Sequence, residues 1–231
     1  MIFALPLEPA TLADIAQALS VGVMLCGFWM LLQRRLVNVV RTYAAQAFLL
    51  ALAAAWQAYV QDERQLLTTA VIILVAKALI VPAVLNRIIV KLDLRRSVAT
   101  SVGFGRGLVG AMGLVGFSML LVFPVTTTSG ALTRETLAMA LSVVFLGFWM
   151  IITRNRAISQ VIALMALENG VLLAVVGVKG MPLVVEMITA VLVLLTFMVF
   201  GIFFFHIRTR FDSLDVRNLE RVHIIPWLRS S

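Results

Sequence analysis

Long apolar runs, separated by short polar and basic segments, make up almost the whole chain. The runs predict helices at about residues 12–32, 40–60, 66–86, 99–123, 133–152, 158–178 and 182–206. Each run is close to the ~20 residues that an α-helix needs to cross a bilayer. The pattern therefore predicts an all-α, polytopic membrane protein with about seven transmembrane helices and short connections.

The composition agrees with this pattern. Hydrophobic residues make up 62% of the chain and charged residues only 13%, whereas soluble domains are roughly 45–50% apolar. The formal net charge is +8, but the basic residues cluster at the ends of apolar runs. We therefore expect contact with a lipid bilayer and no binding of nucleic acid.

Few residues in the chain could hold a cofactor. Cys26 is the single cysteine, so an internal disulfide and a self-contained iron–sulfur cluster are both excluded. The two histidines, His206 and His223, lie at or beyond the end of the last predicted helix, which excludes a haem held between two histidines inside the membrane. We expect no cofactor in this chain.

The distribution of Lys and Arg predicts the orientation. Fourteen of the 19 basic residues fall in alternate loops and in the tail at 208–231, and three fall on the opposite side. The segment before the first run lacks the positive charge of a signal peptide, so this helix is expected to be retained. The positive-inside rule then predicts an external N-terminus and a cytoplasmic C-terminus.

The sequence Gly-Phe-Trp-Met occurs twice, at residues 27–30 and 147–150, and a basic turn follows each copy. The copies lie four predicted helices apart and would be parallel in the membrane. We infer two three-helix units, 12–90 and 133–207, joined by a linking helix at 99–123 within one membrane domain, 1–231. A chance match in an apolar chain is the alternative.

Glu168 lies at the middle of a predicted transmembrane helix. A charged side chain there costs roughly 2.5–3.5 kcal/mol on insertion scales, so such residues usually have a function. Glu168 is the leading candidate for proton transfer, with Asn169 as a neighbouring polar group. Gln46 falls near the corresponding place in the first unit and would supply a hydrogen-bonding scaffold there.

Lys77 is the second candidate, because it also lies midway along an apolar run. Pro82 should kink that helix one turn after the lysine and free the carbonyl of residue 78 as a partner. Lys77 would then act as a proton relay or as a counter-charge. The alternative is that its long side chain extends to the membrane interface.

Two further charged residues have weaker arguments. Glu186 lies about one turn into the last predicted helix and begins a polar stripe with Thr189 and Thr196. The alternative is structural, because the helix dipole stabilises an acidic side chain in the first turn. Arg106 lies in a glycine-rich run at 103–116, where the glycines would allow close helix packing and the arginine would reach the rim or pair with an acid.

These motifs resemble a family of respiratory subunits. A helix ending at Arg154-Asn155, followed by a helix with Leu167-Glu168-Asn169 at its middle, is similar to the three-helix K subunit of bacterial complex I and to the equivalent subunit of multisubunit cation/proton antiporters. The longer helix plan, with Leu-Glu-Asn-Gly at 167–170 and Met-Pro-Leu-Val-Val-Glu at 181–186, resembles component E of hydrogenase-4.

The resemblance implies a non-catalytic subunit of a group 4 nickel–iron hydrogenase in the bacterial plasma membrane. Its partners would be antiporter-like and complex I H-subunit-like membrane proteins and peripheral hydrogenase subunits, which would hold the nickel–iron centre and the iron–sulfur clusters. Glu168 matches the family acid, whereas Glu186 lies about two turns further out than its counterpart. The alternatives are an antiporter subunit without redox partners and a purely structural anchor.

Overall fold

The computed structural model describes residues 9–91, 103–125, 131–177, 185, 187–196, 198–199 and 201. These residues are helical apart from short turns. Two units are distinguished, Met1–Val191 and Leu192–Ser231, and each is considered by itself. In the second unit, residues 192–196, 198–199 and 201 are described, and they are helical.

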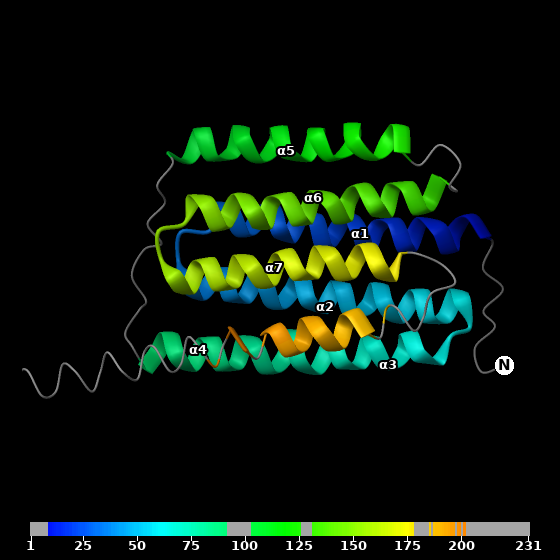
Figure 1. Ribbon diagram of the computed structural model, residues 1–231, viewed down its shortest axis with the longest axis horizontal. Helices are drawn as coiled ribbons and strands as arrows, with labels where there is room; N and C mark the ends of the chain where they lie inside the picture. The colour runs from blue at the N-terminus through cyan, green and yellow to red at the C-terminus, as the bar shows by residue number, and fades with distance from the viewer. Residues whose placement is uncertain are drawn as a thin grey trace, which may run out of the picture. The chain divides into compact units, whose positions relative to one another are not determined.

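The first unit consists of consecutive long helices (Figure 1). They are α1 (Pro9–Leu32), α2 (Leu36–Gln61), α3 (Arg64–Ile72), the π-helix η1 (Ile73–Ile80), α4 (Val81–Lys91), α5 (Phe104–Val125), α6 (Ala131–Thr153) and α7 (Ala157–Val176). Six spans among the described residues are long and apolar enough to cross a membrane, one of them running from Arg64 to Val90 through α3, η1 and α4. The predicted all-α polytopic membrane fold is confirmed.

Some predicted boundaries were wrong. The second helix begins at Leu36 rather than near 40, the third continues to Lys91, and α5 begins at Phe104 rather than near 99. Arg35 has an extended backbone, with φ −107° and ψ 130°, and the helix starts directly after it. Boundaries taken from the apolar runs were too narrow for these helices, because arginines also occur inside helix ends. Their long side chains extend towards the membrane interface.

Four helices form the centre of the first unit. The helix α1 packs on α2, α6 packs on α7, and the two hairpins meet through α1 with α6 and α2 with α7 (Figure 1). The helix α5 covers α6, and the rod of α3, η1 and α4 covers α2. Many outward side chains are large and apolar, for example Val109, Leu120 and Ile152, each about 70% exposed, as expected for a surface in contact with lipid.

Glycines set the close approach of α6 and α7. A Cβ on Gly147 would lie 2.7 Å from the Cβ and 2.9 Å from the Cα of Leu167. A Cβ on Gly170 would lie 2.8 Å from the backbone nitrogen of Val144. Small residues at these two positions therefore let the two backbones come together, which is a common basis of helix packing in membranes.

The glycine-rich helix α5 packs on α6, but few of its glycines lie at the contact. Gly110 faces the Trp149 indole, whose Nε1 donates a hydrogen bond to the carbonyl of Gly107 at 2.9 Å. In contrast, no described atom lies within 4 Å of a Cβ built on Gly105, Gly113 or Gly116. Ser118 on α5 also donates a hydrogen bond to the carbonyl of Ala138 on α6 at 3.3 Å, and the Phe117 ring lies 5.9 Å from the Phe145 ring. The contact of α5 with α6 thus depends on several side chains rather than on a continuous glycine stripe.

The two copies of Gly-Phe-Trp-Met occupy similar places. Gly27 approaches the side chain of Gln46 on α2, just as Gly147 approaches Leu167 on α7. The turns also match, because Arg156 precedes α7 with φ −107° and ψ 129°, nearly the values of Arg35. Gln46 would thus correspond to the residue before Glu168. The duplication itself stays a prediction.

The helix order gathers positive charge at one end of the bundle, here called the basic end, where α1, α4 and α6 end and α2, α5 and α7 begin. Among the described residues it holds Arg34, Arg35, Arg41, Arg87, Lys91, Arg106, Arg154 and Arg156. The opposite end has Arg64 and Arg134. Arg106, expected inside an apolar run, lies in the first turn of α5. The cytoplasmic assignment of the basic end stays a prediction.

We expect Gly147→Ala to destabilise the bundle by about 1–3 kcal/mol, because the added methyl group overpacks the α6–α7 contact. Gly113→Ala, in the open part of α5, should be neutral or stabilising by up to about 1 kcal/mol, since alanine favours helices. Unfolding of both purified variants in SDS, followed by circular dichroism, measures the difference. Equal effects of the two substitutions would contradict the assigned packing.

Candidate functional site: a buried polar cluster

Lys77 lies in the π-helix η1, before Pro82. The N–H of Val81 bonds to the carbonyl of Ala76, five residues back, which defines the wider turn. The structure places a π-helical segment at Ile73–Ile80 ahead of the proline, and the kink predicted after the lysine stays a prediction. Short π-segments of this kind often occur at functional sites.

The Lys77 side chain is fully buried rather than directed to an interface. Its Nζ lies 3.0 Å from Oε2 of Glu168 on α7 and donates a second hydrogen bond of 3.3 Å to Oδ1 of Asn169. The two leading candidates therefore meet directly. These side chains take the place of the freed carbonyl of Ala78 that the sequence suggested as a partner, and the interfacial alternative for Lys77 was wrong.

Hydrogen bonds extend this pair across the bundle. The Nδ2 of Asn169 donates to Oε1 of Gln46 at 3.3 Å, and the Nε2 of Gln46 donates to the carbonyl of Val23 at 3.2 Å. Glu168, Lys77, Asn169 and Gln46, here called the buried cluster, thus connect η1, α7 and α2 with the backbone of α1. All four side chains are at most 2% exposed.

Tyr43 adds a group that the sequence interpretation missed. It is fully buried, and it lies near enough to Glu168 for an electrostatic interaction. Its hydroxyl has no hydrogen-bond partner among the described residues, a condition that costs about 1–3 kcal/mol. Because Tyr43 precedes Gln46 by three residues, helical spacing puts both on one side of α2. This spacing could have indicated from the sequence that Tyr43 lies near the cluster.

The energy of the ion pair is finely balanced. At 3.0 Å two opposite charges attract by about 5 kcal/mol at an effective dielectric constant of 20. Removing each charge from water costs several kcal/mol, and the hydrogen bonds to Asn169 offset part of that cost. A pair with nearly cancelling terms responds to a small change in the surrounding field.

The other two candidates are not part of the described cluster. Arg106 is exposed near the start of α5, which packs mainly on α6 and α1, so it does not supply a counter-charge to Glu168. Glu186 lies outside the described residues. No group of three His, Cys, Asp or Glu side chains that could hold a metal occurs within the described part of the chain.

Arg154 has a structural role that its sequence position did not reveal. Its guanidinium is buried and donates hydrogen bonds to the carbonyls of Met30, Leu31 and Gln33 at 2.9–3.2 Å. These carbonyls lie at or just after the C-terminal end of α1, where the helix dipole favours a cation. Burial lowers the pKa of Arg154 from its ordinary value. The side chain ties the second hairpin to the first.

Comparison with known proteins gives one distant similarity. The chain is 25% identical over 203 residues to the uncharacterized protein Rv0085 of Mycobacterium tuberculosis, and the alignment covers 87% of this chain and 92% of that protein. No protein-family model matches the chain. No solved structure matches it either. The similarity thus extends over most of both chains, and the relative's name states no activity.

We expect that removing one member of the ion pair is more harmful than removing both. Lys77→Met or Glu168→Leu alone should lower the free energy of unfolding by about 3–5 kcal/mol, because each leaves a buried charge unpaired. The double variant should lose much less free energy of unfolding than the sum of the two single losses, since two apolar side chains of similar volume replace the ion pair. Unfolding in SDS of all four proteins completes the cycle.

The control for this cycle is Arg87→Met, which removes an exposed charge at the basic end. It should change stability by no more than about 1 kcal/mol. Additive effects of Lys77→Met and Glu168→Leu would show that the two side chains do not interact in the folded protein.

Proposed function

We propose that this chain is a proton-transfer subunit in the membrane arm of a complex I-related, group 4 nickel–iron hydrogenase of the hydrogenase-4 type. The observation that supports this most directly is the contact of Lys77 with Glu168 inside the bundle. Ionisable pairs at the middle of membrane helices commonly belong to proton or ion pathways. The resemblance of the motifs at residues 154–186 to hydrogenase-4 component E supports the choice of this family.

The proposed step is a proton exchange within the pair. In the charged state the Lys77 ammonium donates hydrogen bonds to Glu168 and Asn169. When a field change favours the neutral state, a proton passes from Nζ to Oε2 and leaves an amine and a carboxylic acid. Glu168 then delivers its proton to the next group, and Lys77 is protonated again. Gln46 holds the Asn169 amide so that its oxygen faces the lysine.

Small energies are enough to drive such a step. A change of one unit in the relative proton affinity of two groups corresponds to about 1.4 kcal/mol. Electron transfer or a conformational change in a neighbouring subunit could supply that amount. In the proposed complex, the nickel–iron centre and the iron–sulfur clusters belong to peripheral partners. Antiporter-like and complex I H-subunit-like chains would continue the proton path in the plasma membrane.

We expect Glu168→Gln to leave the complex assembled and redox-active while proton translocation falls by about 10- to 100-fold, because an amide cannot carry a proton between neighbours. The measurement compares hydrogen-dependent dye reduction with quenching of a pH-sensitive dye in inverted membrane vesicles. Glu63→Gln, in the exposed turn between α2 and α3, is the control and should translocate protons normally. Normal translocation by assembled Glu168→Gln would refute the proposed role.

The partner prediction is tested by gentle purification through a tag at residue 231, with mass spectrometry of every co-purifying chain. A nickel–iron large subunit together with antiporter-like chains would support the hydrogenase assignment. Antiporter-like chains alone, with sodium-dependent proton exchange in vesicles, would instead favour an antiporter. Loss of assembly in Glu168→Gln, with no separate transport defect, would favour a structural anchor held together by the ion pair.

A further inference from the structure

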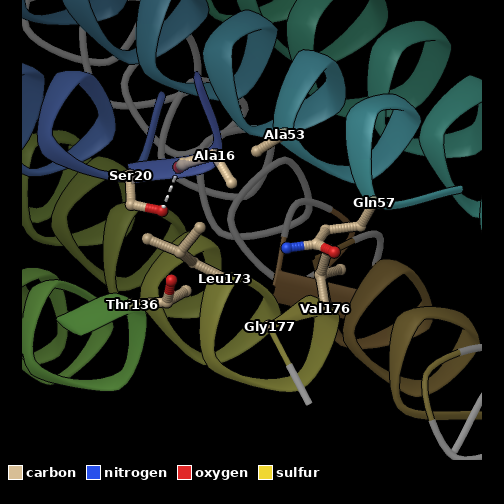
Figure 2. A pocket seen from close by; sticks show the side chains of 8 residues that line it. All are labelled: Ala16, Ser20, Ala53, Gln57, Thr136, Leu173, Val176 and Gly177. Carbon is tan, nitrogen blue, oxygen red and sulfur yellow. Dashed lines mark hydrogen bonds between the residues drawn. The ribbon is translucent and has the colours of Figure 1, made fainter. Parts of the chain in front are cut away.

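A cavity opens between α1, α2, α6 and α7 on the side of the buried cluster away from the basic end (Figure 2). The cavity is small, about 10 Å³, which is roughly the space of one water. Three of the side chains around it are polar, namely Ser20, Gln57 and Thr136. Figure 2 shows the two hydroxyls and the Gln57 amide on different sides of the opening. The remaining lining includes small residues such as Ala53 and Gly177, which leave the space unfilled.

The cavity and the buried cluster lie along one face of α2. Gln46, Leu50, Ala53 and Gln57 are spaced by four, three and four residues, so they follow one side of the helix. Gln46 belongs to the cluster, whereas Ala53 and Gln57 line the cavity. Leu50, which is fully buried, lies between them.

The other helices show how thin the separation is. On α1, Ser20 lines the cavity and Val23, whose carbonyl binds Gln46, follows about 4.5 Å further along the axis. On α7, Leu173 lines the cavity and Asn169 lies about 6 Å away along the axis. The fully buried Leu172 occupies this interval. About one helical turn of apolar packing separates the cavity from the cluster.

We propose that this cavity is a hydrated inlet, with room for about one water, through which protons pass between the external side of the membrane and the Gln46–Asn169 end of the buried cluster. Leu50 and Leu172 form a dry barrier at its floor, and hydration of that one turn connects the inlet to Glu168. The role of the inlet in proton transfer rests on the proposed function of Glu168. Its occupancy by water can be tested without that function.

The lining favours water over an apolar occupant. A cavity that offers several polar partners holds ordered water, whereas a purely apolar one stays dry. Ser20 donates its proton to the carbonyl of Ala16 at 2.9 Å, so its oxygen remains an acceptor. The Gln57 oxygen accepts from Gln61 at 3.2 Å, and its amide nitrogen remains a donor. Thr136 adds a third group that can both donate and accept.

Cysteine accessibility tests the inlet directly. The native Cys26 is first replaced by Ser, and Ala53→Cys, Leu52→Cys or Ala54→Cys is then introduced singly. Leu52 is exposed on the outside of the bundle and Ala54 is fully buried, so both are controls at nearly the same depth as Ala53. A membrane-impermeant, charged methanethiosulfonate is added to right-side-out or inverted vesicles, and the modification rate is measured.

We expect Ala53→Cys to react on the order of 100-fold faster than either control, because the reacting thiolate forms only where water is present. The reaction should occur from the side opposite the basic end. A rate no faster than the controls, or a reaction only from the basic end, would overturn the inlet. Since no turnover is needed, this result is independent of whether Glu168 carries protons.

A second variant tests whether the inlet lies on the proton path. Ala53→Leu fills the cavity at a distance from the ion pair and should reduce proton translocation about 10-fold in a complex of normal redox activity. Leu52→Ala is the control on the outer face of the same helix. If Ala53→Cys reacts quickly but Ala53→Leu translocates protons normally, the cavity holds water but lies outside the proton path. That result would overturn the proposal. Normal translocation by Glu168→Gln would instead refute the proposed function.

Discussion

Two opposite charges in an apolar bundle must be brought together, and much of the arrangement follows from that constraint. Lys77 and Glu168 would each be costly alone in hydrocarbon, and they contact each other at 3.0 Å. Their meeting requires η1 and α7 to lie against the same part of α2. The amide of Asn169 then accepts a second hydrogen bond from Lys77 and donates one to Gln46.

The two hairpins contribute unequally to this arrangement. The first hairpin gives an amide, Gln46, and a backbone carbonyl, and the second gives the acid. Gly27 and Gly147 allow similar close approaches in the two halves, while Arg154 fastens the second half to the end of α1. If the halves arose by duplication, they kept a common packing geometry and diverged in the residues that can carry a proton.

Polarity along the four-helix interior changes in layers. Near one end lies a cavity with polar side chains around it, then an apolar layer with Leu50 of α2 and Leu172 of α7, and then the buried cluster. In the proposed function, this order is a pathway interrupted by a dry segment. Within that function, such an interruption would prevent continuous leakage of protons, because the apolar layer offers no hydrogen-bond partners.

The sequence alone determined the membrane-spanning fold, because length and apolar character limit a chain of this kind to helices that satisfy their own backbone hydrogen bonds. It also identified Glu168 and Lys77, since a charge in the middle of an apolar run is conspicuous. Only the tertiary structure decided that these two side chains, 91 residues apart, meet, and that Arg106 lies elsewhere. Tyr43, the cavity and the role of Arg154 also depended on packing, because hydrophobic periodicity shows that a helix has a buried face without showing which helix covers it.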